Sequence, residues 1–201
     1  MNKLVVSPSP HAHSGLSTAQ CMYGVLIALV PAFLISIYFF GINALLVTAT
    51  SVVACMLFEY LIQKYLLRTT PTLNDGTAIL TGVLLAFNLP ANIPLWIVVI
   101  GALFAIGIGK MAFGGLGNNI FNPALAGRIF LLISFPQQMT SWPAPSPWGT
   151  GVDAVTGPTT LNILKRGNIE EIANIDVINA LIGNNGGSFG EVSAIALIIG
   201  I

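Results

Sequence analysis

The sequence feature that most constrains the fold is Cys21–Phe40, a run of twenty residues without a charged side chain. A second apolar run, Ala44–Gln63, follows a tight turn and contains a single acid, Glu59. An α-helix needs about twenty apolar residues to cross the hydrocarbon core of a bilayer. Both runs meet that length, so we predict two membrane-spanning helices, the first of them kinked at Pro31.

The composition extends this prediction to the whole chain. Of its 201 residues, 55% are hydrophobic and 7% are charged, with a mean hydropathy of +0.86. Soluble domains carry about 25% charged residues, so this chain has too few charges to cover a water-facing surface. The formal net charge is zero without any basic block, which argues against a nucleic-acid partner. Cys21 and Cys55 lie in apolar runs, and we expect both to be core residues rather than a disulfide.

Three further apolar runs, Thr77–Leu89, Leu95–Ile108 and Ala124–Phe135, are interrupted by Gly, Asn and Pro. Such short runs predict discontinuous helices, whose free backbone groups are satisfied inside the protein, often around a ligand or an ion. We therefore expect a cavity for a ligand or an ion here, and its candidate residues are Asp75, Lys110, Gly114, Gly115, Asn118 and Asn122.

Acidic residues beside the apolar runs have two interpretations each. Glu59 lies about one turn before the end of its run, and we expect it at the interface or paired with a basic neighbour. A role in an ion pathway is the alternative, because acids at membrane depth are candidates for function. Asp75 is expected to cap the helix that begins near Thr77. His11 and His13 are expected at the membrane interface rather than on a metal, and we predict no metal site.

The fold class predicted from these patterns is an all-α integral membrane protein with short, broken helices and an extracytoplasmic loop domain. Residues 1–20 form a cytoplasmic lead, 21–136 a bundle of about five spans, 137–190 the outer loop, and 191–201 the start of a further helix. Within the loop we expect helices at Thr160–Arg166 and Ile169–Ile182. With the amino end inside, the basic residues on the inner side are Lys3, Lys64, Arg68 and Lys110, with Arg128 nearby, while Lys165 and Arg166 fall outside.

The polar interval contains the sequence Asp153-Ala154-Val155-Thr156-Gly157-Pro158-Thr159-Thr160-Leu161. Gly157 and Pro158 favour a turn, and a turn can present the Thr159 hydroxyl to solvent. An accessible Thr hydroxyl near an acidic residue is a plausible acceptor for covalent modification. An ordinary Ser/Thr-rich turn is the alternative that composition alone favours.

Three stretches resemble a known family. They are Asn74–Gly82, the block Gly114-Gly115-Leu116-Gly117-Asn118-Asn119-Ile120-Phe121-Asn122-Pro123-Ala124, and Leu131-Leu132-Ile133-Ser134-Phe135-Pro136. The family comprises RnfD, a membrane component of the Rnf electron-transport complex, and the related B-type component of the sodium-translocating NADH:quinone reductase. The resemblance covers residues 7–166, and the short amino-terminal lead favours the Rnf member.

The resemblance implies a covalent flavin. In that family a flavin transferase attaches FMN through its phosphate to a Thr, in a pattern similar to Asp-x-x-Ser/Thr-x-Ala-Thr. Asp153 and Thr156 match this pattern, Gly157 lies between its hydroxyls, and Thr159 takes the acceptor position. Pro158 stands where Ala is usual, and Thr160 adds a competing hydroxyl. The family also implies a second, noncovalent flavin, riboflavin, within the membrane part, so the cavity expected among the broken helices is a candidate site for an ion or a flavin.

The function that the resemblance implies is electron transfer within an ion-translocating ferredoxin:NAD+ oxidoreductase of the bacterial cytoplasmic membrane, coupled to sodium or proton transport. The partners it implies are the Rnf complex proteins RnfA, RnfB, RnfC, RnfE and RnfG, the flavin transferase and lipid, and no side chain of the chain itself is expected to be catalytic. A carboxyl-terminal half beyond residue 201 is also implied. Two alternatives remain open, namely a channel or carrier for a small solute and a redox-inactive structural anchor.

Overall fold

The structure, a computed structural model, describes residues 15, 17–143, 145, 159–166, 181–183, 186–188, 190 and 193–200. Within them the regular structure is helical, which confirms the prediction of an all-α protein for this part of the chain. The α-helices in chain order are α1 (Thr18–Phe40), α2 (Ile42–Leu61), α3 (Thr77–Phe87), α4 (Leu95–Phe104), α5 (Pro123–Ser134), α6 (Pro136–Met139), α7 (Thr160–Arg166) and α10 (Ala194–Ile199).

Three helical segments are long and apolar enough to cross a membrane, namely Thr18–Phe40, Ile42–Leu66 and Leu95–Phe113. The second and third of these continue α2 and α4 through wider or tighter helical turns. The short helices α3 and α5 have 11 and 12 residues, as their interrupted sequences predict. About five apolar helices are therefore present, but only three of the described helices reach the length of a full span.

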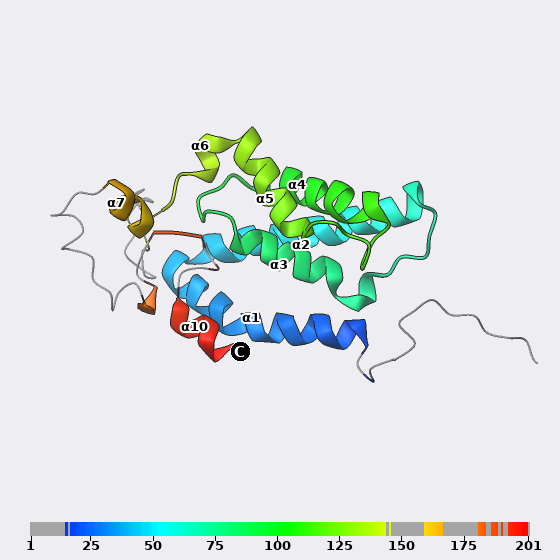
Figure 1. The fold of residues 1–201 in the computed structure, drawn as a ribbon, viewed down its shortest axis with the longest axis horizontal. Coiled ribbons are helices and arrows are strands. Elements are labelled where there is room, and N and C mark those ends of the chain that lie inside the picture. The colour runs from blue at the N-terminus through cyan, green and yellow to red at the C-terminus, as the bar shows by residue number, and fades with distance from the viewer. Residues whose placement is uncertain are drawn as a thin grey trace, which may run out of the picture.

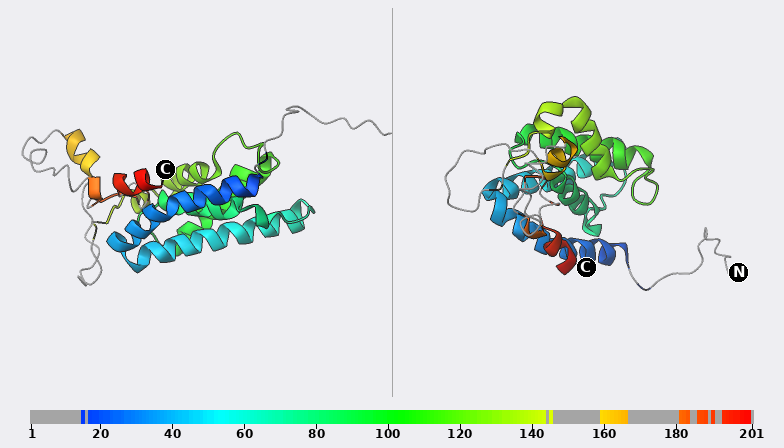
Figure 2. Two further views of the ribbon diagram at one scale, coloured as in Figure 1. Left: turned by 90° about the horizontal axis from the view of Figure 1, so that it is seen from below. Right: turned by 60° about the vertical axis from the view of Figure 1, so that its left-hand side comes forward.

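Helices α1 to α5 lie side by side along the long axis of the molecule (Figure 1). The most extensive helix contact joins α2 to α3, while α4 packs against both α2 and α5. Successive helices alternate in direction, so residues 62–77 and 105–123 meet at one end of the bundle, here called the Lys110 end. Helix α7 lies beyond the opposite end, and α10 packs against α1 (Figure 2).

Small residues bring α2 and α3 into close contact. The Ser51 hydroxyl donates to the Gly82 carbonyl oxygen at 2.7 Å. A Cβ atom on Gly82 would lie 2.6 Å from the Cα atom of Val52, so only glycine fits this crossing. Without a hydrophobic driving force between helices in lipid, such close backbone packing is a main source of helix association. Helices α2 and α3 therefore form a closely packed pair.

Local sequence signals set most of the helix ends. Ser17 and Gln20 form a capping box at the start of α1, and Asn122 caps α5 through the Ala124 amide. Helix α1 is continuous through Pro31, from Thr18 to Phe40. Gly76 occupies the N-cap of α3 with a left-handed φ of 73°, and Asp75, one residue before it, accepts from the Thr77 backbone amide at 3.4 Å, so Asp75 does cap the start of α3, from one position further out. Glycine tolerates that backbone conformation, which moves Asp75 one residue outside the helix.

The outward faces of the long helices are apolar. Exposed side chains include Ile27, Leu34, Val53, Leu57 and Ile133. A contiguous apolar surface of this kind is expected where a bundle meets lipid or another membrane protein. The cysteines divide between the two environments, since Cys55 is buried and Cys21 is exposed. The prediction that both are core residues is thus wrong for Cys21.

Candidate functional site

A buried ion pair lies at the Lys110 end of the bundle. The Lys110 ammonium is 2.6 Å from Glu59 Oε2 and 2.7 Å from Oε1. The two residues are only 2% and 1% exposed, although both belong to segments long enough to span a membrane. A charge in such a position is costly unless it is paired, so the pairing explains how both charges are kept inside the bundle.

The pair continues into a chain of polar contacts. Lys110 also donates to the Thr77 hydroxyl oxygen at 2.8 Å, and that hydroxyl donates to Asp75 Oδ1 at 2.9 Å. Two carboxylates, Glu59 and Asp75, therefore face one ammonium through direct and hydroxyl-mediated contacts. Thr77 is the first residue of α3, so the network ties this short helix to the ends of α2 and α4.

Gln63 joins the other side of Glu59 to the loop that follows α2. Its side-chain nitrogen donates to Glu59 Oε1 at 3.4 Å and to the Thr72 hydroxyl at 3.0 Å. Its side-chain oxygen accepts from the Thr72 backbone amide at 2.9 Å. This double contact holds the loop over the ion pair, so the carboxylate of Glu59 has a fixed polar surrounding on both sides.

Two widened helical turns position these side chains. Residues Ile62–Leu66 and Ala105–Lys110 are π-helical, and each directly extends a long apolar helix. The first ends with a bond from the Leu67 amide to the Ile62 carbonyl oxygen, five residues apart. Single π turns inside α-helices are rare and occur often at functional sites. Here one follows Glu59 closely and the other ends at Lys110.

Two cavities adjoin the ion pair, and Lys110 lines both of them. The first, of about 260 Å³, has a polar side formed by Glu59, Gln63, Thr69, Thr70, Thr72 and Asp75, and is completed by Gly114, Gly115 and the apolar residues Leu67, Met111 and Leu116. The second, of about 330 Å³, extends along α3 from Thr77 to Leu84 and is closed by residues 119–123. Lys110 and Leu116 are the residues that the two cavities share.

The glycine-rich loop after Lys110 forms the rim of both cavities. Gly114, Gly115 and Gly117 have φ values of 101°, 90° and 90°, which side chains with a Cβ rarely adopt. With its amide oriented to suit its neighbours, Asn119 donates to the carbonyl oxygens of Lys110 (3.2 Å) and Gly115 (2.7 Å). The loop therefore folds back on the end of the lysine-bearing turn.

The structure brings together most of the cavity residues named from the sequence. Asp75, Gly114 and Gly115 line the first cavity, Asn122 lines the second, and Lys110 lines both. Asn118 lines neither cavity. Its side-chain nitrogen lies 3.3 Å from the place a Cβ atom on Gly114 would occupy.

The interpretation of Glu59 as an acid paired with a basic neighbour is confirmed. Sequence reasoning does not identify Lys110 as that neighbour, nor does it include Gln63, Thr72 or Thr77 in the site. The sequence shows a lone acid within an apolar run, which indicates that a partner is needed. It does not show which residue that is, because the two partners lie 51 positions apart.

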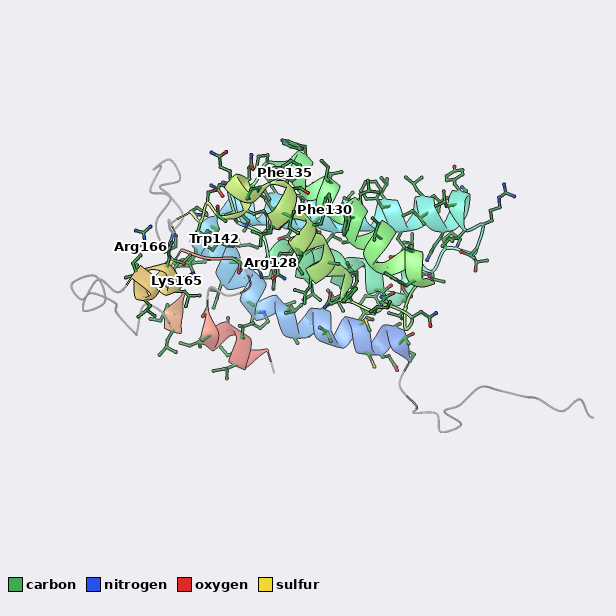
Figure 3. The ribbon with its side chains drawn as sticks, turned by 45° about the horizontal axis from the view of Figure 1, so that its top comes forward. Arg128, Phe130, Phe135, Trp142, Lys165 and Arg166 are labelled. Carbon is green, nitrogen blue, oxygen red and sulfur yellow. The ribbon has the colours of Figure 1, made fainter. Side chains whose placement is uncertain are left out.

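Arg128 departs from the position that the charge pattern predicts for it. Arg128, on α5, donates to the Asn88 side-chain oxygen at 2.8 Å, and Asn88 follows the far end of α3. Its side chain therefore reaches away from the Lys110 end, beside which the charge pattern places it. Figure 3 shows Lys165 and Arg166 on α7, beyond the opposite end of the bundle. Basic residues thus lie at both ends of the bundle as predicted, with the exception of Arg128.

The predicted flavin acceptor begins α7. The Thr159 hydroxyl oxygen accepts from the Asn162 amide at 3.3 Å, and its carbonyl oxygen accepts from the Ile163 amide at 3.1 Å. Thr159 is half-buried. Asp153, Thr156 and Gly157 lie outside the described residues, as do His11 and His13 and nearly all of the predicted helix Ile169–Ile182.

The apolar bundle, its short helices and its charged pair define a multi-span helical membrane protein with a polar site inside one end. Comparison with known proteins identifies its family: the sequence profile of the NQR2, RnfD, RnfE family matches residues 5–201, and the chain belongs to this family.

Several curated relatives are the D components of redox-driven complexes. The chain is 47% identical, over 98% of its length, to the D component of the Na+-translocating ferredoxin:NAD+ oxidoreductase complex of Acetobacterium woodii. It is 42% identical, over 99% of its length, to the D component of the proton-translocating ferredoxin:NAD+ oxidoreductase complex of Clostridium ljungdahlii. The D component of an ion-translocating oxidoreductase complex of Shewanella denitrificans is 42% identical over 84% of the chain and 51% of that relative. The chain spans 60% and 61% of the first two relatives' lengths.

Proposed function

We propose that the chain is part of RnfD, the D component of an ion-translocating ferredoxin:NAD+ oxidoreductase in the membrane. The single observation that carries this proposal is the 42–47% identity to components of that name over nearly the whole chain. The apolar bundle fits a membrane component, and the buried charges fit one that handles an ion. Its proposed place is the bacterial cytoplasmic membrane, with the amino end inside and α7 on the outer side.

The proposed redox group is FMN, attached through its phosphate to the Thr159 hydroxyl. The motif formed by Asp153, Thr156 and Thr159 supports this assignment, and so does the place of Thr159 outside the apolar bundle, at the start of α7 (Figure 1). The half-buried hydroxyl has an oxygen available for a phosphoester. When bound, FMN supplies the ring that carries electrons, and the chain holds it in place and shapes its surroundings. A second, noncovalent riboflavin is proposed within the membrane part.

The proposed partners are the other proteins of the Rnf complex, RnfA, RnfB, RnfC, RnfE and RnfG, together with the flavin transferase that matures the chain. The exposed apolar faces of the long helices offer surfaces for the membrane components and for lipid. A redox-inactive anchor would offer the same surfaces, so the covalent flavin is the feature that separates the two functions.

The experiment that tests the flavin compares Thr159→Ala with Thr160→Ala in cells that contain the flavin transferase. Flavin fluorescence of the denatured chain in a gel, with mass mapping of residues 150–165, reads the attachment directly. We expect the fluorescent band and an FMN adduct in the wild type and in Thr160→Ala, and neither in Thr159→Ala. An unmodified wild-type segment would exclude covalent FMN, and an adduct that disappears only in Thr160→Ala would move it to the neighbouring hydroxyl.

A further inference from the structure

One exposed face of α2 changes in character along its length. Apolar side chains recur on it at intervals of four residues, namely Val53, Leu57 and Leu61. Toward the Lys110 end, α2 continues as the π-helical turn Ile62–Leu66, in which Lys64 and Tyr65 are exposed. The apolar stripe therefore ends in an aromatic ring and a cation.

The Lys64 ammonium lies close to two aromatic rings. It donates to the Tyr60 hydroxyl oxygen at 2.7 Å. Its Nζ atom is 5.0 Å from the centre of the Tyr60 ring and 5.5 Å from the centre of the Tyr65 ring. An ammonium has three donors, and within the part of the chain that the structure describes it forms no ion pair. The rings thus hold a charge that still lacks an anion.

A second cation, Arg68, stands at a backbone position that favours glycine. Its φ of 52° is left-handed, and among the described residues it is the one non-glycine residue with a positive φ. The next amide, of Thr69, bonds to the Gln63 carbonyl oxygen six positions back, the bond by which a left-handed residue closes a helix. Glycine usually fills this position, so the local backbone does not explain an exposed arginine there.

Negative charge near these two cations is already in use. Glu59 and Asp75 are the acidic residues in the described part of the chain. Glu59 is 1% exposed and bonded to Lys110, and Asp75 accepts from the Thr77 hydroxyl. The surface formed by Lys64 and Arg68 is therefore positive, and it is complementary to an anion outside the chain.

We propose that this end of α2 binds the headgroup of an anionic phospholipid, with an acyl chain along Val53, Leu57 and Leu61. At about 1.5 Å of rise per residue, Lys64 lies about 16 Å along the axis from Val53, close to half of the roughly 30 Å hydrocarbon core. One leaflet therefore places the lipid phosphate beside the cation. Tyrosine rings are typical of this depth, and basic residues there attract anionic lipids.

A phospholipid satisfies both parts of this face with one molecule. An acidic loop of another protein could pair with the cations, but it would lie in water and leave the apolar stripe uncovered. A phospholipid carries its phosphate and its acyl chains in the same order and at the same spacing as the cations and the apolar side chains. The inference needs neither the flavin nor ion transport, so it can fail without the proposed function.

Two photoreactive lipids that differ only in the headgroup test the site. Phosphatidylglycerol and phosphatidylcholine, each with a diazirine in the acyl chain, are added to phosphatidylcholine vesicles that contain the full-length protein in the complex with which it purifies. After irradiation, mass spectrometry maps the adducts. We expect the anionic probe to label residues 53–68 roughly tenfold more than the neutral probe. Raised salt should reduce this preference, because it screens the headgroup charge.

The lipid-site variant Lys64→Met/Arg68→Gly removes both cations without opposing the local backbone, since glycine suits the left-handed φ. We expect the preference for the anionic probe to disappear and labelling by the neutral probe to remain. The matched control, Lys165→Met/Arg166→Gly, makes the same two changes beyond the opposite end of the bundle and should leave labelling of residues 53–68 unchanged (Figure 3). Lys64→Met alone is the second variant and should lose part of the preference.

Three results would overturn the proposal. Equal labelling of the wild type by both probes would mean that lipid contacts this face without recognition of its headgroup. A preference that persists in the folded lipid-site variant would place the recognition elsewhere. A wild-type complex without adducts in residues 53–68 would show that another protein covers the face. None of these results bears on flavin attachment at Thr159, which is read separately.

Discussion

The two members of the Glu59–Lys110 pair depend on each other for their solvation. Without Lys110, the Glu59 carboxylate would keep one weak contact, the 3.4 Å bond from Gln63, in a place that is 1% exposed. Without Glu59, the ammonium would still have the Thr77 hydroxyl at 2.8 Å. Removal of Lys110 should therefore lower the free energy of unfolding more than removal of Glu59, although both variants break the same contact.

This asymmetry predicts the order of stabilities of the charge variants. We expect Lys110→Met to lower the free energy of unfolding by about 3–5 kcal/mol, because it leaves an unpaired buried carboxylate. The double variant Glu59→Gln/Lys110→Met should lose clearly less, and Lys64→Met at the surface should stay within about 0.5 kcal/mol of the wild type. Denaturation of the purified chain in detergent micelles measures this order. Equal losses for the single and double variants would show that packing, not charge, governs the site.

At single residues, the sequence predicts that a partner is needed but does not identify the partner. Glu59 is recognisable as an acid that needs a partner, because it interrupts an apolar run. The identity of that partner depends on how α2 and α4 pack, and no local pattern encodes it. Asp75 likewise resembles a helix cap, and the left-handed Gly76 displaces it by one position.

The bounds of the helices are predicted better from the sequence than the contacts of single residues are. The predicted runs Cys21–Phe40, Thr77–Leu89 and Ala124–Phe135 match α1, α3 and α5 to within three residues at each end. Length, hydropathy and the breaking residues Gly, Asn and Pro determine these boundaries, and all three can be read locally. The π turns could not be predicted, because they follow from how the helix ends pack together.

The α2–α3 crossing gives a prediction at this scale. We expect Gly82→Ala to destabilise the bundle by about 1–3 kcal/mol, because its Cβ atom would meet the Val52 backbone at 2.6 Å. Gly24→Ala, in α1, is the matched control, since nothing lies within 4 Å of its added Cβ atom. That variant should be neutral or slightly stabilising, because Ala favours a helix over Gly. Thermal unfolding in detergent compares the two, and a tolerated Gly82→Ala would contradict the close packing.

For the whole molecule, the distribution of basic residues predicts how the bundle lies in the membrane. Lys64, Arg68 and Lys110 belong to one end, and Lys165 and Arg166 lie beyond the other (Figure 3). Cytoplasmic loops carry the excess of Lys and Arg in membrane proteins, so the Lys110 end should face the cytoplasm. The cavities beside Glu59 and Lys110 would then lie on the inner side and the Thr159 segment on the outer side.

Site-directed labelling measures this orientation. In a Cys21→Ser background, where the remaining Cys55 is buried, Arg166→Cys and Arg68→Cys place one reactive thiol at each end. A membrane-impermeant maleimide added to intact spheroplasts should label Arg166→Cys. It should label Arg68→Cys only after the membrane is permeabilised. The reverse pattern would invert the proposed topology.

The π turn at Ala105–Lys110 has a consequence for how this segment tolerates insertions and deletions. In an α-helix each residue advances the chain by about 100° around the axis, so loss of one residue rotates everything that follows by that angle. The π turn, whose hydrogen bonds join residues five apart, holds about one residue more than an α-helical turn, so loss of one residue within it can be absorbed by a return to α-helical bonding that keeps Lys110 directed toward Glu59. Loss of a second residue has no such reserve and would carry Lys110 around the helix and away from Glu59, even if every side chain of the site were kept.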